Sequence, residues 1–514
     1  MAAARKGKCT RFGDCSIADF KKTIEVPAGA DFVCPECKTP LAPVSEPGPG
    51  VPKSVIAAGV VVLIGLAFWF FWPAKGPKPI PQLSPSIVPS PSPAVVARIL
   101  RLHGSNTIGD KLAPELVKAF IISRGGNYVR TTKLGEDEVL LEFVESGRNE
   151  AVEIFSKGSA TAFPDLASGA CDVGMASRRI KPEENQQLID AGLGDMTSPG
   201  SENVLGLDGI AVVINRDNPV QALSKAQIRA IFTGEITNWS QVRGEPGHIQ
   251  VYARNDKSGT FDTFKTLVLA GQPLLPLAPV FRFESSPALD DKVASDAAGI
   301  GFIGLPYAIH SKKIAVSEAD TAPLMPSAFT VATEDYPLSR RLFLYISPTR
   351  TTSLVRDFVD FALAEEGQKV VERVGFIAQI IRYTPVPVPP NPPPQYLQLV
   401  GNAQRVNVDF RFRTGSDTLD NKALRDVDRI VNFLAEHRDL GIILLGFADN
   451  KGGDRINCPL SQRRAHSVAE QLGLRGIHPD GIAGFCSRLP VADNSTDEGR
   501  EKNRRVEIWV RAKA

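Results

Sequence analysis

The sequence predicts a multidomain α/β protein with a small additional N-terminal domain and one membrane-spanning helix. Short apolar strands alternate with amphipathic helices along residues 98–384 and again along 398–514, which is the pattern of α/β domains. Two proline-rich segments, 73–97 and 385–397, separate these regions and favour extended linkers that cannot form a core. Residues 54–72 carry no charge, as expected of a single transmembrane helix.

The composition argues against two classes of function. A net charge of +2 with 23% charged residues disfavours a nucleic-acid binder, because such proteins carry a clustered basic face. An enzyme is also disfavoured. The 6 histidines form no H-E-x-x-H motif, no G-x4-G-K-[ST] phosphate loop is present, and the candidate ligands described below include no nucleophile paired with a base.

The residues before the predicted span indicate its orientation. Lys and Arg are concentrated in residues 1–53 and are sparse just after residue 72, so the positive-inside rule places the N-terminus in the cytoplasm and the bulk of the chain in the periplasm. Residues 1–48 contain four cysteines, the last two as "CPEC", and this set matches a four-thiolate zinc ribbon. The expected Zn²⁺ ligands are Cys9, Cys15, Cys34 and Cys37; free thiols are the alternative.

The remaining cysteines leave one question open. Cys458 and Cys486 lie in the part expected outside the cytoplasm, where a disulfide is permitted. The sequence does not show whether the two approach each other. Cys171 is most simply a small buried hydrophobic residue.

Three turns between a strand and a helix carry glycine next to hydroxyl side chains. They are "HGSNTIG", "SKGSATAF" and "NDKSGTF", and Arg254 lies four residues before Ser258 in the last. Free N–H groups at a helix N-terminus favour an anion. One such turn alone is more simply a helix cap. Three that converge, with Arg254 as a bidentate donor, would hold a tetrahedral oxyanion.

Residues 98–384 resemble the periplasmic phosphate-binding component of ABC transporters. The resemblance rests on "GSNTIG", "GSATAF", "DVGMASR", "LDGIAVVINRDNPV", "IFTGEITNWSQV", "ARNDKSGTFDTF" and "GIGFIGLPYA", which occur in the family's order. It implies a two-lobed clamp of the type II periplasmic-binding-protein fold that closes on its ligand by hinge motion, and an ABC permease as a possible partner. The ligand contacts implied are Thr107, Ile108, Ser159, Arg254, Ser258, Gly259 and Thr260.

Arg178 is a departure from this pattern. It follows "DVGMAS", where the best-studied phosphate binders carry an Asp that rejects sulfate. Arg178 adds a hydrogen-bond donor to the expected site, and the absence of the Asp removes the group that rejects sulfate. The resemblance therefore implies binding of phosphate or a similar oxyanion.

Residues 398–514 resemble the OmpA-like peptidoglycan-binding domain. The matching residues are Gly446, Asp449, Asn457, the run "LSQRRA" and the late "NRRVE". The resemblance implies that Asp449 pairs with the amino group and Arg464 with the carboxylate of diaminopimelate in the stem peptide, supported by Asn457 and Arg504. On the residues alone, a structural salt bridge is the alternative for Asp449 and Arg464.

These features together predict an inner-membrane-anchored periplasmic protein that binds phosphate or a similar oxyanion and also binds peptidoglycan. It would act as a solute receptor or sensor for phosphate uptake. The alternative is a structural tether between the inner membrane and peptidoglycan, in which the clamp binds nothing.

Overall fold

The computed structural model describes residues 5–8, 23–26, 32–35, 38–43, 96–256, 258–274, 280–319, 321–412 and 416–513. The chain divides into two compact units, Met1–Ser92 and Pro93–Ala514. The predicted membrane span at 54–72 lies outside the described residues. Within the described ranges, no helix is both long and apolar enough to cross a bilayer.

The described part of the first unit is a small antiparallel sheet. Its strand order is β2-β1-β3, formed by β1 (Arg5–Lys8), β2 (Thr23–Val26) and β3 (Ala42–Pro43). Cys34 is buried with Val26 and Leu41, and its carbonyl accepts the N–H of Lys38 at 3.0 Å in a tight turn. The other three expected zinc ligands, Cys9, Cys15 and Cys37, lie outside the described residues.

In the second unit, one 11-stranded sheet runs through two lobes. Its order is β12-β11-β13-β9-β16-β8-β4-β7-β6-β5, with β14 also paired to β9. The lobes meet at the long strand β9 (Glu202–Ile214), which pairs with β16 (Ser339–Tyr345) in its first part and with β13 (Gly299–Gly304) in its last. Every residue of β9 is buried, which explains its nearly continuous apolar sequence.

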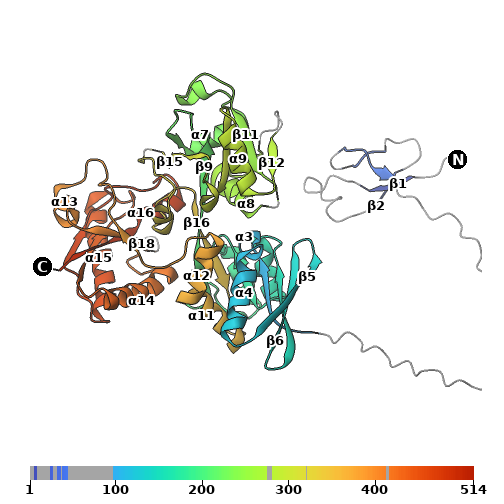
Figure 1. Ribbon diagram of the computed structural model, residues 1–514, viewed down its shortest axis with the longest axis horizontal. Coiled ribbons are helices and arrows are strands. Elements are labelled where there is room, and N and C mark those ends of the chain that lie inside the picture. The colour runs from blue at the N-terminus through green and yellow to red at the C-terminus, as the bar shows by residue number, and fades with distance from the viewer. Residues whose placement is uncertain are drawn as a thin grey trace, which may run out of the picture. The chain divides into compact units, whose positions relative to one another are not determined.

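The first lobe lies at the β16–β5 end of the sheet (Figure 1). Its core packs three helices against the central strands. The strands are β4 (Ala97–Gly104), β5 (Asn127–Gly135), β6 (Glu138–Glu145), β7 (Arg148–Phe155) and β8 (Val173–Ala176). The helices are α3 (Asn106–Gly109), α4 (Leu112–Ser123), α5 (Ser159–Ser168), α6 (Pro182–Asp190), α11 (Ser353–Leu363) and α12 (Glu365–Val374).

The second lobe has its own core, in which the rings of Phe264 and Phe302 stack with centroids 3.9 Å apart. Its strands are β10 (Ala222–Ser224), β11 (Gln250–Arg254), β12 (Phe281–Phe283), β13, β14 (Lys312–Lys313) and β15 (Ala315–Ser317). Its α-helices are α7 (Lys225–Thr233), α8 (Gly259–Phe264), α9 (Ser286–Ser295) and α10 (Ala328–Ala332). Short helical segments are η1 (Trp239–Val242), η2 (Lys265–Leu269) and η3 (Leu305–Tyr307). The predicted two-lobed α/β clamp is therefore observed.

The C-terminal domain is a five-stranded sheet of order β17-β18-β21-β19-β20 with helices packed on it. The strands are β17 (Tyr383–Thr384), β18 (Gln404–Arg411), β19 (Leu440–Gly446), β20 (Gly481–Gly484) and β21 (Arg505–Ala512). The helices are α13 (Pro394–Val400), α14 (Asn421–Glu436), α15 (Gly453–Gly473) and α16 (Asp497–Asn503).

The junction before this domain differs from the expected spacer. Helix α13 begins at Pro394, inside the segment 385–397, because a proline is well tolerated in the first turn of a helix. Strand β17 pairs with β18 of the C-terminal sheet, although Tyr383 and Thr384 were expected in the clamp. The chain therefore enters the C-terminal domain before the proline-rich segment, which leaves little length for an extended linker.

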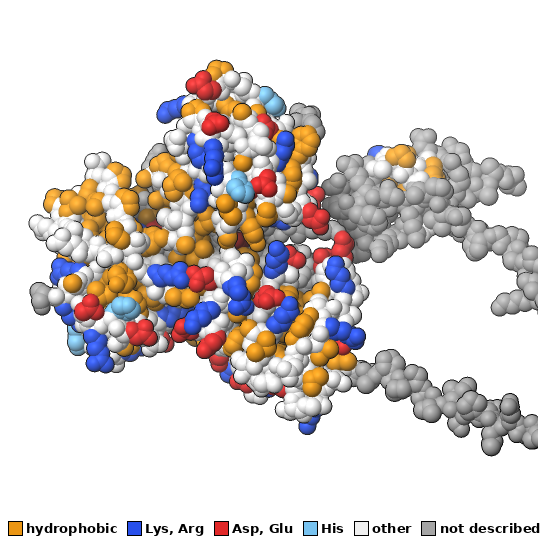
Figure 2. All heavy atoms as spheres, viewed as in Figure 1, with side chains coloured by type: hydrophobic (Ala, Val, Ile, Leu, Met, Phe, Trp, Pro, Cys, Tyr) orange, Lys and Arg blue, Asp and Glu red, His pale blue; other side chains and the backbone are white. Residues whose placement is uncertain are grey.

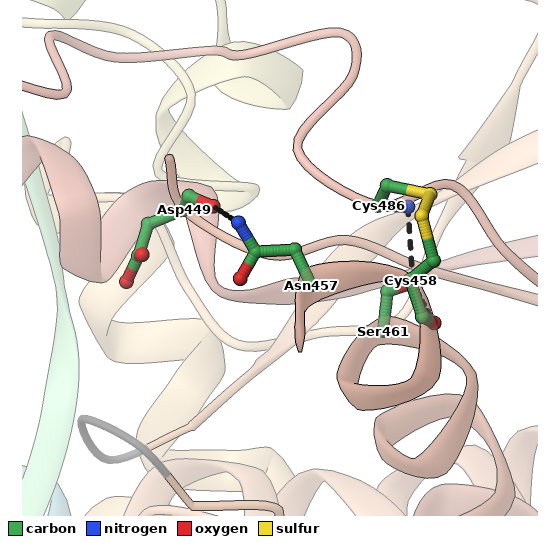
Figure 3. The surroundings of a disulfide bond; sticks show 5 residues. All are labelled: Asp449, Asn457, Cys458, Ser461 and Cys486. Atoms are coloured by element: carbon green, nitrogen blue, oxygen red, sulfur yellow. Dashed lines mark hydrogen bonds between the residues drawn. A yellow bond between two sulfur atoms is a disulfide. The ribbon is translucent and has the colours of Figure 1, made fainter. Parts of the chain in front are cut away.

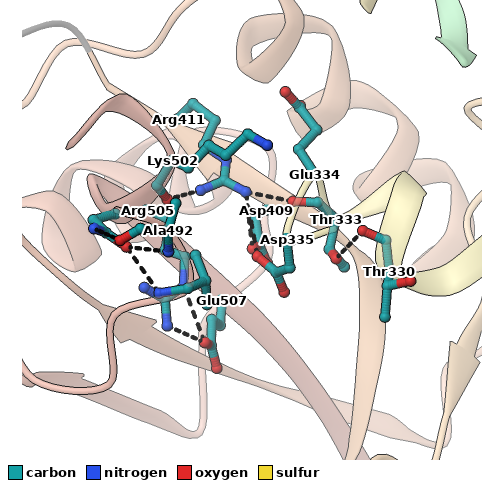
Figure 4. Close-up of polar contacts among 12 residues, drawn as sticks. Thr330, Thr333, Glu334, Asp335, Asp409, Arg411, Ala492, Lys502, Arg505 and Glu507 are labelled. Atoms are coloured by element: carbon teal, nitrogen blue, oxygen red, sulfur yellow. Dashed lines mark hydrogen bonds and ion pairs between the residues drawn. The ribbon is translucent and has the colours of Figure 1, made fainter. Parts of the chain in front are cut away.

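The C-terminal domain is packed against the second lobe through buried ions. Arg411 on β18 donates to the carbonyl oxygen of Thr333, just after α10 (Figure 4). Arg405, on the same strand, pairs with Asp335 at 2.9 Å. These groups are almost fully buried, and a buried charge without a partner is costly. These ion pairs therefore favour this one packing of the C-terminal domain on the second lobe.

The same domain also contacts the first lobe. Asn421, at the start of α14, donates to the carbonyl oxygen of Thr197 at 2.8 Å. Arg425 on the same helix donates to the side-chain oxygen of Asn203 on β9 at 2.6 Å. The C-terminal domain therefore bridges the two lobes, and it lies beside both of them in Figure 1.

Candidate functional site

The three glycine-containing turns begin helices as predicted. Helix α3 begins at Asn106, α5 at Ser159 and α8 at Gly259. Gly104, before the first turn, has a φ of 132°, and a Cβ there would lie 2.1 Å from the carbonyl oxygen of Met175. Only glycine fits this close approach of β4 to β8.

The lobes touch at two of the predicted ligand residues. A Cβ on Gly259 would lie 2.4 Å from Thr107 Oγ1 and 2.9 Å from the Thr107 backbone nitrogen. The start of α8 in the second lobe therefore abuts α3 in the first. Ile108, the next residue of α3, is fully buried. Two of the three turns thus meet across the boundary between the lobes.

Arg340 on β16 is at the centre of this junction, although no sequence motif indicated it. Its Nη2 donates to Thr107 Oγ1 at 2.6 Å and to the Gly259 carbonyl oxygen at 3.0 Å. Its Nε lies 3.4 Å from Asp208 Oδ2 on β9. Burial lowers the pKa of Arg340, and the Asp208 carboxylate opposes that shift. Arg340 is therefore a buried cation where the two lobes meet, and it is paired with the carboxylates of Asp208 and Asp262 at 3.4 and 3.7 Å.

Arg254 is near this junction but points to another element. Its guanidinium donates to the carbonyl oxygens of Phe283 and Glu284, at 3.3 and 2.7 Å, and to the Ser286 hydroxyl. Burial lowers the pKa of Arg254. The turn after it contains Ser258, which is buried, and Thr260, which lies on the first turn of α8. In this structure the Arg254 donors are directed to the start of α9.

The third turn contributes a pair of serines in the first lobe. Ser159 Oγ accepts the N–H of Ser177 at 3.0 Å and lies 3.1 Å from Ser177 Oγ. Arg178, the next residue, makes a bidentate ion pair with Glu184 on α6, at 2.6 and 2.8 Å. Ser177, Arg178 and Arg340 line one cavity of about 220 Å³ that extends towards the C-terminal domain. Arg178 is therefore close to the junction while its donors are used by Glu184.

The predicted peptidoglycan-binding residues lie together. Asp449 Oδ2 accepts from Arg504 Nη1 at 2.9 Å, and the Asp449 carbonyl oxygen accepts from Asn457 at 2.8 Å (Figure 3). Arg464 on α15 donates to the carbonyl oxygens of Phe447 and Ser416, at 3.2 and 3.1 Å. The structure brings these four side chains into one neighbourhood, in which Asp449 pairs with Arg504.

Arg464 retains an unused donor. Its Nη2 is buried and has no hydrogen-bond partner among the described residues. Burial and the nearby charge of Arg504 lower the pKa of Arg464 to about 10. Because a buried cationic donor is costly without an acceptor, this side chain is suited to a ligand carboxylate.

A disulfide fixes the helix that carries these residues. Cys458 on α15 is bonded to Cys486 after β20, with Cα atoms 4.0 Å apart (Figure 3). Ser461 Oγ accepts the N–H of Cys486 at 3.0 Å and donates to the Cys458 carbonyl oxygen at 2.9 Å. The structure thereby answers the question that the sequence left open.

Comparisons with known proteins agree with this architecture. A model of the PBP superfamily domain matches residues 132–366. Protein SphX of Synechococcus elongatus is 30% identical over 253 residues, which cover 47% of this chain and 73% of SphX. The chain belongs to the PBP superfamily. A model of the OmpA family matches residues 411–504, within the C-terminal domain.

Two further similarities are to a phosphate-binding protein and to a phosphate transport receptor. The phosphate-binding protein PstS of Staphylococcus aureus (strain bovine RF122 / ET3-1) is 26% identical over 230 residues, 43% of this chain and 67% of PstS. The crystal structure of an ABC-type phosphate transport receptor from Vibrio cholerae is 23% identical with a TM-score of 0.43. It covers 54% of this chain and 99% of the receptor.

Proposed function

We propose that the protein is a solute receptor for phosphate or a similar oxyanion, and that its C-terminal domain binds peptidoglycan. The observation that carries the first part is the buried Arg340, which donates to groups of both lobes at the Thr107–Gly259 contact. A cation placed where two helix N-termini meet is suited to a tetrahedral anion. The phosphate-binding protein PstS, which is 26% identical over 230 residues, supports the choice of anion.

A receptor fits the site better than an enzyme. The groups described at the junction are Arg340, the Thr107 hydroxyl, the Gly259 carbonyl oxygen and the Asp208 carboxylate, and no nucleophile is paired with a base among them. Figure 2 shows Lys and Arg interspersed with Asp and Glu on the face in view, and no broad basic area is present among the residues coloured there.

The peptidoglycan part of the proposal rests on the group around Asp449. Its carboxylate and the unused donor of Arg464 can pair with the two opposite charges of diaminopimelate. The finer features complete the proposal: a membrane anchor at 54–72, a zinc ribbon with Cys9, Cys15, Cys34 and Cys37, and an ABC permease as partner. A zinc assay on the purified chain, with and without a chelator, tests the ribbon.

The deciding experiment is calorimetric titration of the full-length protein with phosphate and then with sulfate. We expect saturable phosphate binding in the wild type and its loss in Arg340→Gln and Arg254→Ala. An exposed arginine of the first lobe supplies the matched control, Arg356→Gln. If folded, ligand-free protein binds neither anion, the receptor proposal fails and the alternative of a structural tether remains. Sulfate binding would show that the site does not select phosphate over sulfate.

A further inference from the structure

A cavity of about 320 Å³ lies between the first lobe and the C-terminal domain. Its first wall comes from the clamp, through Arg179, Thr197 and Glu202; the C-terminal domain supplies the second, with Phe412, Glu501 and Arg504. This volume is within the range of small-ligand sites. Neither domain forms the cavity alone.

The cavity adjoins the predicted peptidoglycan-binding residues. Arg504 lines it and also donates to Asp449 Oδ2 at 2.9 Å. Phe412 lines it as well, and the guanidinium of Arg464 lies over the Phe412 ring at 5.4 Å. Arg464 is the side chain whose buried Nη2 has no partner among the described residues. A ligand bound at Asp449 and Arg464 can therefore extend into the neighbouring cavity.

The clamp side of the cavity offers a cation that a ligand can reach. Arg179 pairs with Glu202 on β9 at 3.2 Å and with Glu501 of the C-terminal domain at 3.2 Å. The side chains of Arg179 and Glu501 remain 40% and 42% exposed, so this ion pair is open to exchange with solvent or ligand. Asn421 fixes the wall behind it by donating to the Thr197 carbonyl oxygen.

We infer that the stem peptide of peptidoglycan occupies a composite site. Its diamino acid binds at Asp449 and Arg464, and the neighbouring peptide residue extends into the cavity, where Arg179 of the clamp pairs with a peptide carboxylate. A stem peptide offers a carboxylate to Arg179 and backbone N–H groups to the acidic residues Glu202, Asp420 and Glu501, which also line the cavity. The inference rests on the proposed peptidoglycan binding and extends it, since it makes a residue of the solute receptor part of the wall-binding site.

The test compares two soluble probes on the full-length protein: free diaminopimelate and a tetrapeptide stem that contains it. We expect Arg179→Gln to weaken tetrapeptide binding about tenfold, as for loss of one charge-assisted hydrogen bond, and to leave free diaminopimelate unaffected. Arg464→Gln should weaken both probes. Arg356→Gln, an exposed arginine of the same lobe, should weaken neither.

A second variant separates ligand binding from domain docking. Glu501→Gln removes the ion pair between the domains but keeps Arg179, so tetrapeptide affinity should be retained or increased. Circular dichroism and thermal melting report whether each variant remains folded. If Glu501→Gln weakens the tetrapeptide as Arg179→Gln does, Arg179 only docks the domains and the inference is overturned.

Two further outcomes would contradict the composite site. Unchanged or stronger tetrapeptide binding in Arg179→Gln contradicts the composite site while leaving peptidoglycan binding in place. If wild-type protein binds neither probe, the proposed peptidoglycan function fails, and the composite site fails with it.

Discussion

Gly259 decides whether the two lobes can close as they do here. A Cβ at this position would lie 2.7 Å from the Thr107 Cα and 2.4 Å from its Oγ1. Backbone atoms on both sides leave little room for relief, and overpacking of this kind costs about 1–3 kcal/mol. We therefore expect Gly259→Ala to weaken phosphate binding about tenfold to a hundredfold in a calorimetric titration.

A matched glycine provides the control. A Cβ on Gly247, in the same lobe, would meet no atom within 4 Å. Gly247→Ala should bind phosphate like the wild type. Wild-type affinity in Gly259→Ala would show that the contact between Thr107 and Gly259 is not part of the bound state.

Glu334 gives the protein a predictable response to acid. Burial by itself would raise the pKa of this carboxyl, but the charges of Arg341 and Lys422 hold it at about 2. The pKa of Glu334 in the folded protein is lower than its unfolded value of about 4.3. The ionised carboxylate therefore stabilises the fold above that pH, and this stabilisation is lost as the pH falls towards 2. The shift corresponds to about 3 kcal/mol.

We expect Glu334→Gln to destabilise the protein at pH 7 and to differ less from the wild type at pH 3. Denaturant unfolding at both values measures this. Glu366→Gln, an exposed carboxyl on α12, is the control and should show no such dependence on pH. An equal difference between wild type and Glu334→Gln at both values would contradict the assignment.

Among the elements, helix α15 depends on its disulfide. It carries Asn457 and Arg464, and Cys458 joins it to Cys486 across a separation of 28 residues. Closing a loop of this length stabilises a fold by about 3–4 kcal/mol. We expect reduction to lower the melting temperature and to weaken stem-peptide binding. The double variant Cys458→Ser/Cys486→Ser should behave like the reduced protein and should not respond to reductant.

The elements predicted best are those with local signals. The helix at Lys225–Thr233, for example, begins with a capping box of Ser224 and Gln227 and ends at Gly234, which has a φ of 86°. Such caps act within a few residues, so the sequence reveals them. The three turns that begin α3, α5 and α8 were also predicted from a local signal, glycine next to hydroxyl residues, but none of these helices has a side-chain cap hydrogen bond.

Sequence reasoning missed Arg340 because its role depends on distant contacts. Arg340 and Thr107 are 233 positions apart, and only the pairing of β16 with β9 brings them together. Strand β18 illustrates the same limit, because its alternation of apolar and charged residues does not reveal that Asp409 and Arg411 are buried where the C-terminal domain packs on the clamp. Polar positions on a strand indicate water only when no second domain covers them.

At the scale of the whole molecule, the bridging position of the C-terminal domain affects ligand binding. It contacts the second lobe through Arg411 and the first through Arg425. If the lobes separate by hinge motion, the domain must lose contacts to one of them. Docking therefore adds to the free energy that favours the closed state, and a ligand that selects this state binds more tightly.

Releasing either side of this bridge should weaken phosphate binding. We expect Arg411→Met and Arg425→Met each to lower phosphate affinity about three- to tenfold, the effect of losing about 1 kcal/mol of bias. Arg438→Gln, an exposed arginine of the same domain, should have no effect. Unchanged affinity in both folded variants would mean that the lobes close independently of the C-terminal domain. A decrease in both would mean that the domain proposed to bind peptidoglycan also sets the affinity of the receptor for its anion.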